Sequence, residues 1–195
     1  NKQPDFQEWS QNFGPFVKNL TLVFWLFFFG SVVLFRKMLL RLKNKDCWIL
    51  TIFYILFLLG IIFSRYSTGS LFNGENFISK SFYYVSVLLF IAVFIYYYIS
   101  YHKSKDESFE KIRFEYLLLF SLFILTIFTA RGAVRLIMVL GPIAPIFVGF
   151  LIVELGDNFL KKKELTKILI GILLMIVLIS SIYSFSVFYQ SIKVQ

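Results

Sequence analysis

Six long runs of apolar residues, separated by short polar and charged stretches, make up most of the chain. They cover residues 16–35, 47–63, 81–101, 116–130, 136–155 and 168–188. Most reach, and the shortest approach, the roughly 17 to 25 residues that a helix needs to cross a bilayer. None has the ten-residue alternation of a barrel strand, and backbone in lipid must satisfy its own hydrogen bonds. The pattern predicts an all-α fold, a polytopic transmembrane helical bundle of about six spans.

Composition supports a membrane protein and excludes several kinds of site. Hydrophobic residues make up 58% of the chain, compared with about 45–50% in a soluble domain. A single cysteine, Cys47, rules out an intramolecular disulfide, and a single histidine, His102, cannot build a histidine metal site. The net charge of +9 comes from basic residues in short loops rather than on one soluble face, so no nucleic-acid partner is expected.

The distribution of the basic residues predicts which ends of the helices face the cytoplasm. Three loops hold thirteen of the twenty Lys and Arg residues: Arg36, Lys37, Arg41, Lys43, Lys45, Lys103, Lys105, Lys111, Arg113, Lys161, Lys162, Lys163 and Lys167. The other seven fall on the opposite side: Lys2, Lys18, Arg65, Lys80, Arg131, Arg135 and Lys193. The positive-inside rule then makes both termini extracytoplasmic. Residues 1–15 are predicted to end an external loop, and residues 16–190 to form the transmembrane helical domain.

Arg131 and Arg135 are the candidate substrate-binding residues. They lie between two apolar runs, at the predicted outer end of a helix, and their spacing of four residues would place both on one helical face. Arginine stays charged and is costly near lipid, so a pair at this position is expected to bind an anion such as a lipid-linked phosphate. The alternative is that both side chains only extend to the head groups of the membrane.

Two prolines follow this pair within the fifth apolar run. Pro142 and Pro145 each remove a backbone donor, and inside a spanning helix they would kink it and open a cavity. The alternative is an ordinary proline kink without a functional role, which membrane helices tolerate.

The sequence around Arg135 resembles the membrane domain of the oligosaccharyltransferase catalytic subunit. Val134-Arg135-Leu136, four apolar residues, Gly141 and Pro142 match a string at the outer end of a helix in that family. The residues Lys2 to Trp9 resemble the sequence just after a glutamate-ending loop motif, and residues 64–80 resemble archaeal members. The chain is therefore expected to be the C-terminal part of a longer membrane domain of the archaeal type, with the hairpin 47–101 as an addition to the common family plan.

This resemblance implies a function and a set of partners. The family transfers a glycan from a lipid-phosphate carrier to the acceptor asparagine of Asn-x-Ser/Thr sequons, and the position that matches Arg135 contacts the phosphate. The expected partners are the lipid-linked oligosaccharide, an acceptor polypeptide and membrane lipids. The expected location is the archaeal cell membrane, or the endoplasmic reticulum membrane in a eukaryote.

The resemblance also implies what this chain lacks. The family holds a divalent metal, Mg or Mn, with acidic residues of external loops, and reads the acceptor with a soluble domain that carries a Trp-Trp-Asp-Tyr-Gly motif. Neither a DxD pair nor that motif occurs in the sequence. No catalytic residue and no metal ligand is thus expected here, and the chain alone should be inactive.

Two other classes of protein fit the same residues. One is a different polyprenyl-phosphate-dependent glycosyltransferase or a polysaccharide polymerase, which would also need an external arginine for phosphate. The other is a transporter or assembly subunit without enzymatic activity, in which Arg131 and Arg135 serve orientation or gating.

Overall fold

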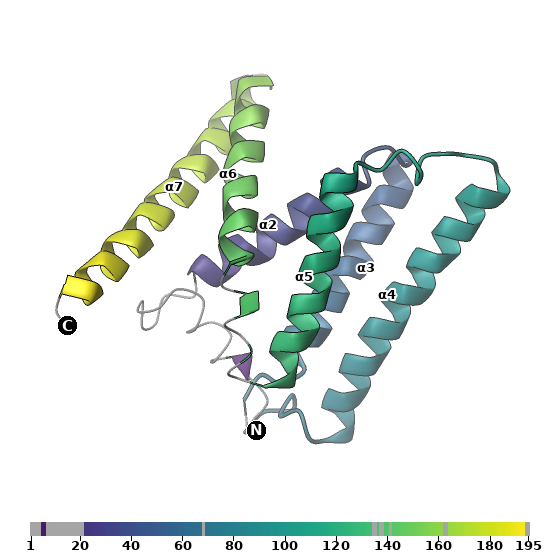
Figure 1. The fold of residues 1–195 in the computed structure, drawn as a ribbon, viewed down its shortest axis with the longest axis horizontal. Coiled ribbons are helices and arrows are strands. Elements are labelled where there is room, and N and C mark those ends of the chain that lie inside the picture. The colour runs from purple at the N-terminus through teal and green to yellow at the C-terminus, as the bar shows by residue number, and fades with distance from the viewer. Residues whose placement is uncertain are drawn as a thin grey trace. The chain divides into compact units, whose positions relative to one another are not determined.

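The protein is all-helical in the parts that the computed structural model describes, residues 5–6, 22–67, 69–133, 136, 139–140, 142–161 and 164–193. Over these ranges it contains six helices and no strand, as Figure 1 shows. They are α2 (Leu22–Met38), α3 (Asn44–Phe63), α4 (Phe77–Lys103), α5 (Phe114–Gly132), α6 (Ala144–Lys161) and α7 (Glu164–Lys193). The predicted all-α class is confirmed.

Each helix overlaps one of the six apolar runs, but the helices differ in how well they suit a bilayer. Among the described residues, α3, α4 and α5 are long and apolar enough to cross a membrane. The α2 helix has 17 residues, which is near the lower limit for a span. The membrane character predicted from the sequence thus rests on the three central helices.

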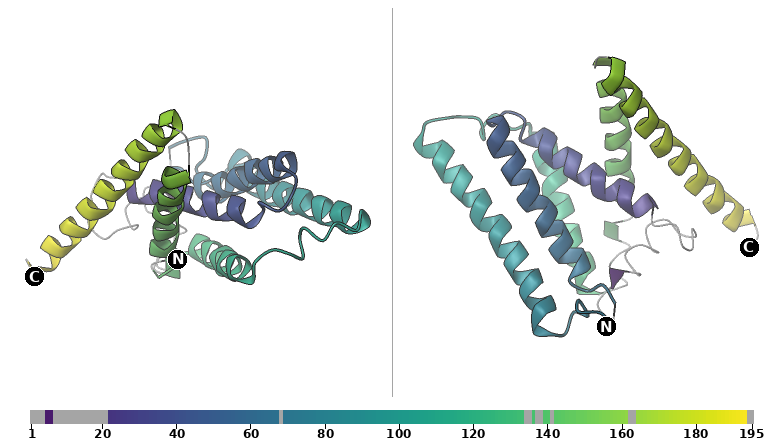
Figure 2. Two further views of the ribbon diagram at one scale, coloured as in Figure 1. Left: turned by 90° about the horizontal axis from the view of Figure 1, so that it is seen from above. Right: turned by 180° about the vertical axis from the view of Figure 1, so that it is seen from behind.

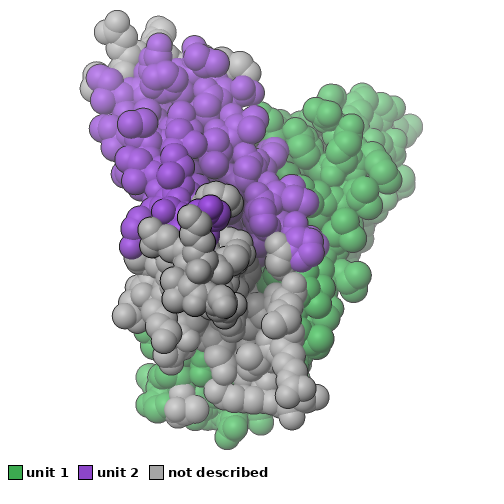
Figure 3. Space-filling view, turned by 60° about the vertical axis from the view of Figure 1, so that its left-hand side comes forward, with its two compact units in different colours: residues 1–8, 32–140 green, residues 9–31, 141–195 purple. Residues whose placement is uncertain are grey.

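The chain forms two compact units, coloured separately in Figure 3. Unit 1 comprises residues 1–8 and 32–140, and unit 2 comprises residues 9–31 and 141–195. The second half of α2 belongs to unit 1 and the first half to unit 2.

Unit 1 is built around α3, which packs along α4 and also contacts α5. The pairing of α3 with α4 is visible in every ribbon view (Figures 1 and 2). Buried aromatic side chains fill the space between the helices. The Tyr54 and Phe35 rings stack with centroids 4.2 Å apart, and the Phe57 and Phe90 centroids are 4.8 Å apart. Phe120 brings α5 into this cluster, 5.2 Å from Phe35. Such pairs add to the stabilisation that comes from burial alone.

The α3 and α4 backbones approach most closely at Gly60. A Cβ atom at this position would overlap the Oγ and Cβ atoms of Ser86 on α4. Ser86 is itself buried and donates its hydroxyl hydrogen to the Tyr83 carbonyl oxygen at 2.9 Å. A small residue on each helix therefore sets the distance between them.

At the end of unit 1 where the basic loops lie, one tyrosine ties α4 to the start of α3. The Tyr101 hydroxyl donates to Asp46 Oδ2 at 2.8 Å and accepts the backbone N–H of Lys43 at 3.0 Å. The 104–113 connection to α5 begins at this same end, and its Asp106 accepts the backbone N–H of Ser108 at 3.0 Å. The loop between α3 and α4 lies at the opposite end, as the alternation of basic and less basic loops predicts.

Unit 2 contains the hairpin of α6 and α7 and the first half of α2. Gly30 of α2 faces the backbone of Phe147 so closely that a Cβ atom there would meet the Phe147 carbonyl. The Phe27 and Phe147 rings meet edge to face at 5.8 Å. In the hairpin, the Lys167 ammonium lies 5.1 Å from the centre of the Phe159 ring.

The prediction that Pro142 and Pro145 kink a helix over 136–155 is wrong. The described residues show that α6 begins at Ala144, after Pro142, so that Pro145 lies in its first turn. Proline is tolerated there because the N–H groups of the first turn have no intrahelical partner. These prolines start a helix rather than bend one.

Replacing Gly60 with alanine is expected to destabilise unit 1 by about 1–3 kcal/mol, because the added methyl group overpacks the α3–α4 contact. Thermal unfolding of the detergent-solubilised protein checks this. Gly156→Ala is the matched control, since a Cβ atom there meets nothing within 4 Å and alanine favours the helix. Equal melting temperatures for the two variants would refute the proposed contact.

Candidate functional site

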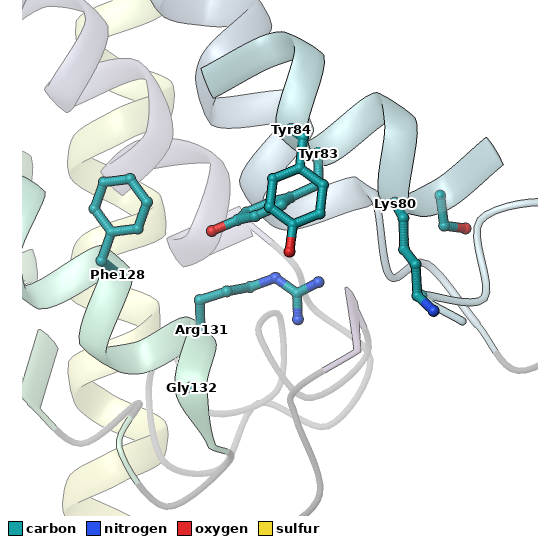
Figure 4. Close-up of a pocket in the computed structure, with 8 residues that line it drawn as sticks. Lys80, Tyr83, Tyr84, Phe128, Arg131 and Gly132 are labelled. Atoms are coloured by element: carbon teal, nitrogen blue, oxygen red, sulfur yellow. The ribbon is translucent and has the colours of Figure 1, made fainter. Parts of the chain in front are cut away.

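A cavity of about 320 Å³ lies at the end of unit 1 opposite the basic loops. Figure 4 shows it between the start of α4 and the end of α5. Eight residues line it: Gly74, Ser79, Lys80, Tyr83, Tyr84, Phe128, Arg131 and Gly132. All of them belong to unit 1.

The start of α4 is fixed by two asparagines. The Asn76 side chain caps the helix by accepting the Ser79 N–H at 2.9 Å, and the Asn73 side chain accepts the N–H groups of Glu75 and Asn76. The buried Ser79 hydroxyl donates to the Leu71 carbonyl at 3.1 Å, which ties the helix to the loop before it. Capping side chains replace the partners that the first N–H groups of a helix lack.

The loop between α3 and α4 is held against the end of α3. Arg65 and Asn73 form an isolated antiparallel bridge, and the Tyr66 N–H donates to the Phe72 carbonyl at 2.7 Å. Gly74 takes a φ of +83°, a conformation that suits glycine and closes the turn formed by the Asn73–Asn76 sequence. A Cβ atom on Gly74 would overlap the Arg65 side chain, so this glycine also makes room for the arginine.

Phe6 packs against the same loop from the N-terminal segment. Its N–H donates to the Arg65 carbonyl at 2.8 Å. Its ring stacks on Phe63 with centroids 4.6 Å apart and on Tyr66 with centroids 5.5 Å apart. Aromatic rings therefore pack against the loop next to Arg65.

Arg131 reaches the cavity from the last turn of α5. Its Nη2 donates to the Oγ atom of the buried Ser64 at 3.4 Å, and its guanidinium carbon lies 5.5 Å from the centre of the Tyr83 ring. Figure 4 shows this side chain extending toward the two tyrosines of α4. A hydroxyl and an aromatic face, contributed by two other elements, thus hold the guanidinium in one position.

The described side chains that line the cavity include positive charge. Among the described residues that line it, two are cations, Lys80 and Arg131, and none is a carboxylate. The positive charge of Arg65 also acts on Arg131. Glu75 lies 4.0 Å from Arg65, but its side chain is 83% exposed, so it is screened by solvent.

Of the two predicted binding residues, the structure places Arg131 in this cavity, and Arg135 lies outside the described residues. That the two share one helical face stays a prediction, because Arg135 is not described. The α5 helix ends at Gly132, and Ala133 is extended, with φ −159° and ψ 149°. A spacing of four residues gives a shared face only while the helix continues.

Lys80, Tyr83 and Tyr84 were not predicted as site residues. The sequence assigns Lys80 to the same side as Arg131, but it does not show that α4 and α5 bring them to one cavity. The sequence Asn73-Gly74-Glu75-Asn76 was the available signal. Its asparagines start the helix at Phe77 rather than Ser81, which places Lys80 in the first turn.

Within the ranges that the structure describes, no group of three or more His, Cys, Asp or Glu side chains could hold a metal ion. The residues around the cavity therefore do not fit a divalent metal. The metal that the family resemblance implies stays a prediction, with its ligands expected outside this chain.

No protein-family model, no curated protein and no solved structure matches the chain. The basis for a functional proposal is therefore the chemistry of the cavity, together with the sequence around Arg135.

Replacing Gly74 with alanine is expected to destabilise the loop by about 1–2 kcal/mol, because a φ of +83° is strained for a residue with a Cβ atom. The added atom would also displace Arg65. Gly69→Ala, in the same loop, is the control, since no atom lies within 4 Å of its Cβ position. Thermal unfolding and limited proteolysis of the loop compare the two, and equal behaviour would contradict the assigned turn.

Proposed function

We propose that this chain is part of the membrane domain of an oligosaccharyltransferase, an enzyme that moves a glycan from a lipid-phosphate carrier to asparagine in Asn-x-Ser/Thr sequons. Three helices that could span a membrane support the location. The Val134-Arg135-Leu136 string and its trailing proline support the family. The cation-lined cavity around Arg131 supports an anionic ligand at this end of the bundle.

The observation that carries the proposal is the fixed guanidinium of Arg131 at the end of an apolar helix. The Ser64 hydroxyl and the Tyr83 ring position it, and Lys80 shares its cavity. A charge placed where lipid begins costs free energy, and a lipid-borne phosphate at the same depth offsets that cost. Arg135 follows three residues after the end of α5, and its role comes from the family resemblance.

In the proposed reaction, the acceptor amide nitrogen attacks the anomeric carbon of the glycan, and the bond from that carbon to the phosphate oxygen breaks. Negative charge develops on the departing phosphate. A guanidinium that is held in position before the charge develops can stabilise it without reorganising, and a planar guanidinium can donate two parallel hydrogen bonds to a phosphate. Activation of the acceptor belongs to residues outside this chain, so the chain alone is proposed to be inactive.

The proposed arrangement in the membrane has six spans with both termini extracytoplasmic. In unit 1, the ends of α3, α4 and α5 that carry most of the basic residues lie together, which is the arrangement that the positive-inside rule places in the cytoplasm. The cavity then faces the exterior of an archaeal cell or the lumen of the endoplasmic reticulum.

Cysteine labelling tests this orientation, because Cys47 is the only cysteine of the chain and is buried. In a Cys47→Ser background, Ser70→Cys is expected to react with a membrane-impermeant maleimide in intact cells, and Ser108→Cys only after permeabilisation. Both positions lie in loops, at opposite ends of unit 1. The reverse pattern of labelling would overturn the proposed topology.

Glycan transfer tests the proposed activity in the intact gene product that contains this segment. Arg135→Ala is expected to raise the activation free energy of glycan transfer by a few kcal/mol. Glycopeptide formation should then slow on the order of a hundredfold. Arg135→Lys should recover little of this, because the planar fork is lost. Arg113→Ala, at the opposite end of α5, is the control. Unchanged glycan transfer by the Arg135→Ala variant would contradict the proposed role of this arginine.

A further inference from the structure

We infer that one stripe of α4, which runs from Lys80 to Lys103, lies against the acyl chains of the bilayer. The hydrocarbon layer ends between Lys80 and Tyr84 on one side and between Tyr98 and Lys103 on the other. The inference rests on the proposed membrane location but not on the proposed glycan transfer. It identifies what covers the outer face of the α3–α4 hairpin and the depth at which the cavity lies.

The stripe follows the three- and four-residue spacing that places side chains on one face of a helix. In order, it contains Lys80, Tyr84, Leu88, Ile91, Ile95, Ile99 and Lys103. Every one of these residues is exposed in this chain, and Leu88 at 64% is among the most exposed leucines of unit 1. The α4 helix thus presents a continuous aliphatic surface with one lysine at each end.

The rest of the described chain covers little of α4. Buried residues make up 11% of its most apolar window, compared with 50% for α3. Figures 1 and 2 show α4 at the edge of unit 1, with α3 beside it. The buried residues of α4 are Ser79, Ser86, Phe90 and Tyr101, none of which belongs to the stripe. Packing on α3 and exposure of the stripe therefore use different sides of the same helix.

The residue types on these two sides indicate lipid rather than another helix as the cover of the stripe. Helices that pack together in a membrane use small residues at the contact. The α4 side that meets α3 has them, since Ser86 lies against Gly60. The stripe has only branched aliphatic side chains between its tyrosine and its second lysine. Such side chains suit contact with acyl chains, which need no close approach of two backbones.

The order of residue types along α4 matches the layers of a bilayer. Tyr84, Tyr96 and Tyr98 are 61%, 67% and 51% exposed, and exposed tyrosines gather where hydrocarbon meets the head groups. Lysine side chains at the ends of a span extend their ammonium groups to the head groups. The sequence lysine, tyrosine, aliphatic residues, tyrosines and lysine is therefore the order expected of a helix in contact with lipid on this side.

The distances along the axis also fit. At about 1.5 Å per residue, Lys80 and Lys103 are about 35 Å apart, and Tyr84 and Tyr98 are about 20 Å apart. A hydrocarbon core of about 30 Å lies between these two values. Both pairs have their midpoint close to Ile91, which is 46% exposed. Ile91 is thus assigned to the centre of the bilayer.

This register gives the depth of the cavity. Tyr84 lines the cavity and lies at the boundary of the hydrocarbon, and Lys80, which also lines it, lies about one helical turn further out. The cavity is therefore at the depth of the lipid head groups. A lipid phosphate occupies this same depth.

Spin labelling tests the stripe in the intact gene product, with Cys47 and every cysteine outside this chain replaced by serine. Single cysteines at Tyr84, Leu88, Ile91, Ile95 and Ile99 receive a nitroxide label, and the protein is placed in lipid vesicles. Collisions with oxygen, which concentrates in hydrocarbon, are compared with collisions with a water-soluble nickel chelate. All these positions are exposed, so the labelled variants should fold as the parent protein does.

We expect oxygen to dominate over the nickel chelate along the whole stripe, with the largest ratio at Ile91 and a decline toward Tyr84 and Ile99. Val87→Cys is the matched control, since it is close to Leu88 in depth but half-buried, and its collisions with oxygen should be fewer. Ser70→Cys, in the loop before α4, should show the reverse preference, for the nickel chelate.

Three other results would overturn the inference. Few collisions with either reagent at Leu88, Ile91 and Ile95 would show that another segment of the gene product covers the stripe. Spectral broadening that disappears on dilution with unlabelled protein would show that a second copy covers it. A preference for the nickel chelate at these positions would place the stripe in water and would also overturn the proposed membrane location.

Failure of the proposed enzyme is visible in a different measurement. Absence of glycan transfer by the intact gene product would overturn the oligosaccharyltransferase assignment and leave the oxygen profile of α4 standing. Conversely, glycan transfer that depends on Arg135, together with few oxygen collisions along the stripe, would support the enzyme and overturn the lipid contact.

Discussion

The close approach of α3 and α4 at Gly60 and Ser86 is the constraint on which the cavity depends. Gly60 precedes Ser64 by about one helical turn, and Ser86 follows Tyr83 by about one turn. The small residues thus fix the two groups that hold Arg131, the Ser64 hydroxyl and the Tyr83 ring, relative to each other. A larger residue at Gly60 would change the distance between α3 and α4 and, with it, the position of the guanidinium.

The hydrophobic pattern was sufficient to predict the helices. In a bilayer, a helix is the main structure that satisfies the hydrogen bonds of every backbone N–H and C=O group. The pattern was not sufficient to predict the ends of the helices. The α4 helix begins at Phe77 because Asn76 caps it, and α6 begins at Ala144 because Pro142 and Pro145 suit a start. Capping and proline effects act over one turn, and a hydropathy pattern averaged over a whole span does not resolve them.

The candidate site likewise contains one residue that the sequence alone indicates and others that only the packing of the helices brings together. Arg131 could be predicted because an arginine beside two apolar runs is unusual in the sequence itself. Lys80 could not, because an exposed lysine in a loop has no such signal, and its relation to Arg131 depends on how α4 and α5 meet around α3. The end of α5 at Gly132 could not be predicted either, because the hydrophobic pattern gives no strong signal for it.

The hairpin of α3 and α4 is fastened at both of its ends. Tyr101 bonds to Asp46 and to the Lys43 backbone at one end, and the Arg65–Asn73 bridge closes the loop at the other. Between these points, Gly60 and the aromatic cluster leave little freedom for the two helices to separate. A bulky ligand that needs a wider entrance would therefore have to displace α5, the wall that carries Arg131, while the Lys80 wall stays in place. In such a mechanism α5 is the helix that moves to admit the ligand, and the α3–α4 hairpin is the fixed element against which it moves.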